Sequence, residues 1–259
     1  PIIVHPDVRR NLLSIRAFNE AARALVVWAA LKSDIAHRSK DAAGAQAAAD
    51  ALGLVTPVLK GVLTDRGFDN AVIAQQVLGG HGYIEEWGME QFVRDARIAM
   101  LYEGANGIQA LDLVGRKLPK DGGRALSAFL GEVKAFIKEN EAEPSLSPYI
   151  SGLAQGIAHL EQATFWFMQN AIAKPDNAGA GSYDYMHLMG LVVLGFMWAH
   201  IAKAAIGKKA GPNGDAAAMD ARLLRGKYFM ERLMPETALR LARITSGAGT
   251  MMAIAAEQF

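Results

Sequence analysis

The sequence contains no cysteine among its 259 residues. Disulfide bonds, thiol nucleophiles and thiolate metal sites are therefore excluded, and the absence is compatible with a reducing compartment, so we expect a cytoplasmic protein. The six histidines form no HExxH motif and show no other spacing that is typical of a metal site. We expect no bound metal.

A strong net charge and a long apolar run are also lacking. The 27 basic and 26 acidic residues leave a formal net charge of +1, which gives no long-range field to attract a phosphate backbone, so nucleic acid is not an expected partner. The longest uncharged apolar run, from Leu188 to Ala199, is shorter than the roughly 20 residues that span a bilayer. It predicts a buried helix, and no integral membrane segment is expected.

No stretch alternates polar and apolar residues over a useful length, so no β-strand is predicted. Apolar residues recur instead at helical spacing, and with 51% hydrophobic residues the chain can bury a large core. The sequence predicts an all-α fold, in which Pro57 kinks the second helix without ending it. The expected helices span about 6–37, 44–77, 89–96, 106–118, 123–141, 147–173, 181–207, 216–234 and 236–258.

Breaker residues divide this pattern. The cluster at 119–123 predicts a linker between a bundle at 1–118 and a helical extension at 124–259, and loops are expected at 143–148, 174–182 and 207–215. Methionine and aromatic residues are concentrated in the extension and are expected to pack in the core, with the lining of an apolar tunnel as the alternative. They are Phe165, Trp166, Phe167, Met168, Met186, Met189, Phe196, Met197 and Trp198.

The stretch from Gln76 to Leu118 holds the densest set of polar residues and glycines. Its Gly79-Gly80-His81-Gly82-Tyr83 run breaks a helical pattern and predicts a helix C-cap. A nicotinamide dinucleotide fingerprint is rejected, because Glu85 occupies the place of the third glycine and a helix precedes the turn.

Glu103 follows an apolar segment and precedes a predicted helix start. Taken alone, such a carboxylate is most often a capping acid. Gly104, Ala105 and Gly107 open that helix, whose free N–H groups suit an anion.

Four elements of this stretch occur together, in order, over about forty residues. They are Gln76 to Tyr83, Arg94-Asp95-Ala96, Tyr102-Glu103-Gly104 and Ile108-Gln109. In this order they resemble the C-terminal catalytic domain of the acyl-CoA dehydrogenases. The continuation Gly-Ile-Gln-Ala-Leu-Asp is similar to a subgroup with a long helical C-terminal extension, which includes methylmercaptopropionyl-CoA dehydrogenases.

The resemblance implies an oxidoreductase of fatty-acid β-oxidation that uses FAD. Glu103 is then the general base that removes a proton from Cα of an acyl-CoA thioester while a hydride leaves Cβ for the flavin, giving a trans-2-enoyl-CoA. Its backbone N–H helps to polarise the thioester carbonyl. Gln76, Gly79 and Gly80 are expected to meet the ADP half of FAD across a dimer interface.

By the same resemblance, the segment with Gly104, Ala105 and Gly107 approaches the flavin. Many members have Thr at the place of Ala105 and Gln or Glu at that of Gly107, so one hydrogen bond to the cofactor is expected to be missing or supplied elsewhere.

The family further implies a homodimer or dimer of dimers that passes electrons to an electron-transferring flavoprotein. Its β domain, its N-terminal helical domain and the first helix of the bundle are not in this sequence, so we expect a C-terminal fragment that is inactive alone. Two alternatives stay open: an acyl-CoA oxidase, which passes electrons to O₂, and a non-catalytic helical scaffold in which Glu103 is only a cap.

Overall fold

The computed structural model describes residues 1–211 and 215–259, and these contain helices and no strand. The predicted all-α fold is confirmed. The main helices are α1 Pro6–Arg38, α2 Ala42–Val77, α3 Gly80–Tyr83, α4 Met89–Ile98, α5 Asn106–Asp112, α6 Arg124–Asn140, α7 Ser147–Asn170, α8 Pro175–Lys209, α9 Ala216–Arg232, α10 Glu236–Thr245 and α11 Gly249–Met252. Shorter 3₁₀ turns lie at Ile2–Val4, Glu85–Trp87, Lys120–Gly123, Pro144–Leu146 and Ala256–Gln258, and a π-helical segment, Leu113–Lys117, continues α5.

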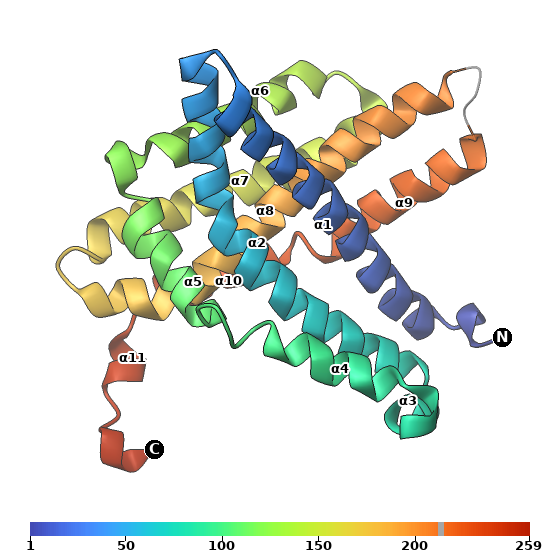
Figure 1. Cartoon of the computed structure of the whole chain (residues 1–259), viewed down its shortest axis with the longest axis horizontal. Coiled ribbons are helices and arrows are strands. Elements are labelled where there is room, and N and C mark those ends of the chain that lie inside the picture. Colours follow the sequence, from blue (N-terminus) through green and yellow to red (C-terminus); the bar gives the residue numbers. More distant parts are fainter. Residues whose placement is uncertain (212–214) are drawn as a thin grey trace.

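Helices α1 and α2 form a long antiparallel pair, with the short α4 alongside the second half of α2 (Figure 1). Pro6 occupies the first turn of α1, where its missing N–H costs no hydrogen bond. The side chain of Asp41 caps α2 by accepting a hydrogen bond of 3.1 Å from the N–H of Ala43. As predicted, α2 does not end at Pro57 but continues to Val77.

Helix α8 is the central element of the fold. Every side chain from Tyr185 to Ala199 is buried, because α1, α2, α5, α7, α9 and α10 all pack against it. The buried helix predicted at Leu188 to Ala199 is confirmed. By length and composition alone α2 and α8 could cross a membrane, but 72% of the apolar window of α8 is buried inside the protein, as in the core helix of a folded domain.

The core is continuous across residues 119–123. Leu25 and Val58 on one side of this segment belong to the same buried cluster as Val192 and Trp198 on the other. The indole N–H of Trp198 donates a 2.9 Å hydrogen bond to the carbonyl of Ala17. The expected units 1–118 and 124–259 thus share one core, and the division between them stays a prediction.

Two predicted boundaries are wrong. Helix α8 starts at Pro175, inside the expected loop 174–182, because Pro175 and Asp176 make a favourable first turn. The helix expected at 236–258 ends at Thr245, since Gly247 has a φ of 69° and the side chain of Asn177 accepts the N–H of Ala248. In the expected loop 207–215, α8 extends to Lys209, and residues 212–214 lie outside the described part.

The aromatic and methionine residues are mainly core residues, as expected. Phe167, Met186, Met189, Phe196, Met197 and Trp198 are buried. Phe165 and Met168, however, are 58% and 66% exposed. The buried stripe of α7 passes through Leu160, Ala163 and Phe167, at intervals of three and four residues, and this spacing leaves Phe165 and Met168 on the outer face.

Candidate functional site

The glycine turn ends α2 and redirects the chain toward α4. The predicted C-cap is confirmed: α2 ends at Val77, and Gly79 has a φ of 60°, which residues with a side chain rarely adopt. Gly82 packs so closely that an added Cβ would lie 2.3 Å from the carbonyl oxygen of Gln75. Gln76, Gly79 and Gly80 are exposed at this corner.

The loop between α4 and α5 carries Glu103. Glu103 has a φ of 52° and Gly104 a φ of 82°. Outside glycine such a conformation costs roughly 1–2 kcal/mol, so the backbone is strained at the residue predicted to be the base. Glu103, Gly104, Ala105 and Gly107 are all exposed.

Helix α5 begins without using the Glu103 carboxylate. Ala105 is its N-cap residue and makes no side-chain cap, and within residues 1–211 and 215–259 Glu103 makes no side-chain hydrogen bond. The carboxylate therefore makes no capping hydrogen bond to α5, and its expected stabilising effect through the helix dipole stays a prediction. The N–H groups of Asn106 and Ile108 donate to Met100 and Ala105, so the free amides expected at this helix start are partly occupied.

A set of hydrogen bonds centred on the buried Asp65, Asn106 and His187 lies beneath this loop, and we call it the Asp65 network. It comprises Lys60, Thr64, Asp65, Asn106, Tyr183 and His187. The Lys60 ammonium donates to the carbonyl of Gly104 at 2.8 Å and to Oδ1 of Asn106 at 2.7 Å. Nδ2 of Asn106 in turn donates to Oδ1 of Asp65 at 2.6 Å and to Thr64 at 2.9 Å.

The network continues from α2 into α8. Oδ2 of Asp65 accepts the Tyr183 hydroxyl at 2.6 Å and lies 2.9 Å from Nε2 of His187. Burial alone would raise the pKa of the Asp65 carboxyl, but the hydrogen bonds from His187, Tyr183 and Asn106 together hold that pKa below its usual value. Burial and the adjacent Asp65 carboxylate raise the pKa of Tyr183.

Sequence reasoning missed the Asp65 network, although one signal was present. Asp65 follows Val58 and Val62 at helical spacing, so it lies on the apolar face of α2. A lone acid on such a face has to find buried partners, because an unpaired buried charge is costly.

The predicted site residues form two groups, not one. Gln76, Gly79 and Gly80 lie at the corner between α2 and α3, whereas Glu103 and the residues up to Gly107 lie at the opposite end of α4 (Figure 1). Helix α4 has ten residues, which corresponds to about 15 Å. Exposed apolar side chains accompany both groups, namely Tyr83, Trp87, Phe92, Ile98, Leu101 and Tyr102.

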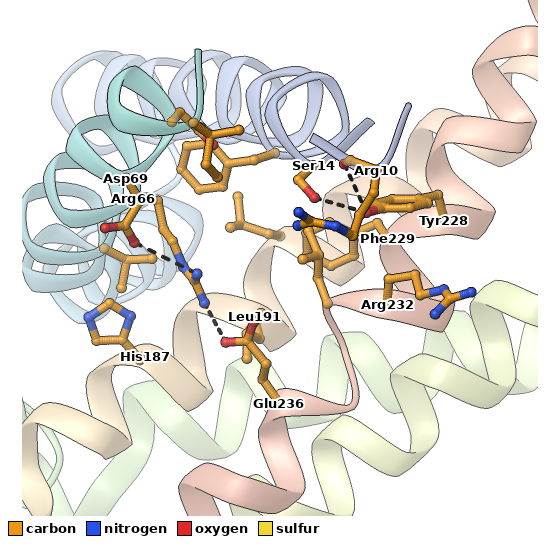
Figure 2. Close-up of a pocket in the computed structure, with 16 residues that line it drawn as sticks. Arg10, Ser14, Arg66, Asp69, His187, Leu191, Tyr228, Phe229, Arg232 and Glu236 are labelled. Carbon is orange, nitrogen blue, oxygen red and sulfur yellow. Dashed lines mark hydrogen bonds and ion pairs between the residues drawn. The ribbon is translucent and has the colours of Figure 1, made fainter. Parts of the chain in front are cut away.

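A separate cavity of about 380 Å³ lies where α1, α2, α8 and the end of α9 meet (Figure 2). None of the predicted site residues lines it, and His187 is the member of the Asp65 network on its wall. Arg66 pairs there with Asp69 and Glu236, and the hydroxyls of Ser14 and Tyr228 are 2.8 Å apart. The buried Nδ2 of Asn70, also on this wall, has no hydrogen-bond partner within the described residues. Because none of the predicted site residues lines the cavity, we place the candidate site at the Glu103 loop.

Two family models match the chain. "Acyl-CoA dehydrogenase, C-terminal domain" matches residues 1–118, and "Acetyl-CoA dehydrogenase C-terminal like" matches residues 129–255. Over 253 residues the chain is 36% identical to 3-methylmercaptopropionyl-CoA dehydrogenase of Ruegeria pomeroyi. The chain belongs to the acyl-CoA dehydrogenase family.

A second curated relative agrees with this assignment, and a solved structure has the same fold. A broad-specificity linear acyl-CoA dehydrogenase of Mycobacterium tuberculosis is 29% identical over 240 residues, which is 89% of this chain. The structure of Caenorhabditis elegans ACDH-11 in complex with C11-CoA has the same fold, with a TM-score of 0.69 and 17% identity over 89% of this chain and 37% of its own. The chain spans 43% of the Ruegeria relative and 39% of the mycobacterial one.

Proposed function

We propose that this chain supplies the general base and one side of the active site of an FAD-dependent acyl-CoA dehydrogenase, which converts an acyl-CoA thioester to a trans-2-enoyl-CoA. The observation that carries the proposal is the Glu103 loop. It combines an exposed carboxylate, a strained backbone at Glu103 and a rigid attachment beneath it. Strain of this kind is kept where geometry matters for function.

Glu103 has the two groups that the reaction requires. Its carboxylate is not used within the described chain, so it is available to take the proton from Cα. Within residues 1–211 and 215–259 its backbone N–H has no acceptor, so this group can donate to the thioester carbonyl, on which negative charge develops as the proton leaves.

The exposed glycines suit contact with a flavin nucleotide. No atom lies within 4 Å of the place that a Cβ would take at Gly79, Gly80 or Gly107, so another molecule can approach the backbone closely. Bound FAD would accept the hydride from Cβ. Ala105 offers only a methyl group, so any side-chain hydrogen bond to the cofactor comes from another residue.

The separation of the two groups supports an assembly of at least two copies. Because α4 lies between Gln76 to Gly80 and the Glu103 loop, we propose that the glycine turn serves the FAD of a neighbouring subunit in a homodimer or dimer of dimers. The exposed apolar residues along α3 and α4 are suited to such contacts.

The remaining expectations follow from the same proposal. Electron-transferring flavoprotein is the proposed acceptor, β-oxidation the proposed process, and the cytoplasmic location stays a prediction. We also propose that the 259-residue chain alone neither retains FAD nor turns over acyl-CoA, since it supplies one side of the site.

Replacing Glu103 with Gln in the full-length protein tests the proposal. The amide keeps the shape of the side chain but cannot take a proton, so anaerobic flavin reduction by saturating acyl-CoA should slow by about 10²- to 10⁴-fold or more. Flavin content and thioester binding should persist. Glu86→Gln, at another exposed carboxylate, is the control. Reduction by Glu103→Gln within about tenfold of the wild-type rate would place the base elsewhere.

A further inference from the structure

The Glu103 loop is exposed on its outer side and fastened on its inner side. Lys60 of α2 holds the Gly104 carbonyl, and Gln109 of α5 donates to the Glu103 carbonyl at 3.3 Å. The N–H of Asn106 closes the loop on the carbonyl of Met100. A backbone with positive φ at Glu103 persists only if its surroundings hold it, and these contacts are the ones that hold it.

Asp65 connects these contacts to α8, because its two oxygens have different partners. Oδ1 accepts from Asn106, next to the loop, whereas Oδ2 accepts from Tyr183 and His187 of α8. An ionised carboxylate only accepts hydrogen bonds, so Nε2 of His187 is a donor. Loss of the α8 donors would leave a buried charge underpaired, and Asp65 would have to move or take up water.

We infer that α8 positions the catalytic base through the Asp65 network, so that His187, Asp65, Asn106 and Lys60 are positioning residues for Glu103. The inference rests on the proposed function of Glu103. It gives the helical extension a role in catalysis, because α8 belongs to the part of the chain beyond residue 123. A displacement of the base by about 1 Å is enough to slow a reaction by about 10²-fold.

A second contact between α2 and the extension provides a matched control. Arg66 of α2 pairs with Glu236 of α10, and both side chains are partly buried (Figure 2). This ion pair lies one residue along α2 from Asp65, and within the described residues neither side chain forms a hydrogen bond or ion pair with the Glu103 loop. If weaker packing of the extension is enough to slow the reaction, Arg66→Met should also be slow. If the effect is specific to the position of Glu103, Arg66→Met should keep its rate.

The first experiment compares Lys60→Met with Arg66→Met in the full-length protein. We expect Lys60→Met to lower the rate of anaerobic flavin reduction at saturating acyl-CoA by about 10- to 100-fold. KM and flavin content should change little, because the side chain contacts the loop backbone and not the ligands proposed above. Arg66→Met should stay within about twofold of the wild-type rate per flavin, even if its melting temperature falls.

The second experiment uses His187. His187→Phe keeps a ring but removes the donor to Asp65, whereas His187→Gln keeps an N–H donor. The Phe variant should slow flavin reduction, and the Gln variant should restore most of the rate. Hydrogen–deuterium exchange gives a readout that is independent of turnover: amides 100–109 should exchange faster in Lys60→Met and His187→Phe, but not in Arg66→Met.

The outcomes separate this inference from the proposed function. If Glu103→Gln is inactive while Lys60→Met and His187→Phe reduce flavin at the wild-type rate, the positioning role is overturned and the base is retained. Equal loss of rate in Lys60→Met and Arg66→Met also overturns it, because the network would then only stabilise the fold. If Glu103→Gln keeps the wild-type rate, the proposed function fails and the inference fails with it.

Discussion

Helix α8 and the segment from Gly79 to Gly107 differ in burial and in their content of predicted site residues. Between Tyr185 and Ala199 every side chain of α8 is buried, and this part of the sequence carries no catalytic motif. The other segment contains nearly all of the predicted site residues and is largely exposed. The buried core and the proposed site thus lie in different segments. Asp65 of α2 links them, because it accepts from Asn106 on one side and from Tyr183 and His187 of α8 on the other.

The largest predicted difference between the two regions concerns two tryptophans. Trp198 of α8 is fully buried, whereas Trp87 at the glycine turn is 57% exposed. Trp198→Ala should lower the free energy of unfolding by about 3–5 kcal/mol, from lost burial and the cavity left behind. Trp87→Ala should cost less than about 1 kcal/mol. Urea unfolding followed by circular dichroism measures both values. Equal losses of unfolding free energy would contradict the proposed difference in stability between α8 and the exposed segment.

The second prediction concerns acid pH and the Asp65 network. The folded-state pKa of Asp65 is lower than its unfolded value of about 3.9, so the folded state holds fewer protons on this group. Its contribution to stability is therefore present above the unfolded pKa and is lost as pH falls through the folded one.

Urea midpoints between pH 6 and pH 3 test this dependence. Asp65→Asn should be less stable than wild type at pH 6, because its side chain carries no charge to accept from Tyr183 and His187. The difference in unfolding free energy between wild type and Asp65→Asn should become smaller as pH falls. A stability difference that stays constant down to pH 3 would mean that the charge of Asp65 does not contribute to the stability of the folded protein.

A smaller effect is predicted for Tyr183, which donates to the charged Asp65. Tyr183→Phe should cost about 1.5–3 kcal/mol, whereas Tyr228→Phe, whose hydroxyl bonds two neutral groups, Ser14 and the Arg10 carbonyl, should cost about 0.5–1.5 kcal/mol. Thermal or urea unfolding of the two variants gives the comparison. A larger loss for Tyr228→Phe would show that the charge on Asp65 does not strengthen its hydrogen bonds.

The smallest effect is predicted at Glu103 itself. Glycine relieves the strain of the positive φ but adds freedom to the unfolded chain, so Glu103→Gly should be more stable than Glu103→Ala by about 0–1 kcal/mol. Both variants lack the proposed base, which makes them a matched pair for stability alone. A glycine variant that unfolds more easily than the alanine variant would show that the loop is not strained.

Much of the fold could be predicted from the sequence, because apolar residues recur at helical spacing and this periodicity is strong in α4 and α6. The wrong helix boundaries arise from single tertiary contacts, such as the hydrogen bond between Asn177 and Ala248, which the spacing of apolar residues cannot reveal. For the site, the motif around Glu103 was visible by resemblance. The Asp65 network was not, because Asp65 lies 41 residues from Asn106 and 122 from His187, and only tertiary packing brings the three together.

The most direct test of Glu103 as the base separates proton removal from hydride transfer. Full-length protein with its flavin already reduced would be mixed with an acyl-CoA deuterated at Cα, and nuclear magnetic resonance would follow the loss of deuterium to water. We expect steady exchange by wild type and exchange at least about 100-fold slower in Glu103→Gln. Exchange at the same rate in both proteins would contradict it.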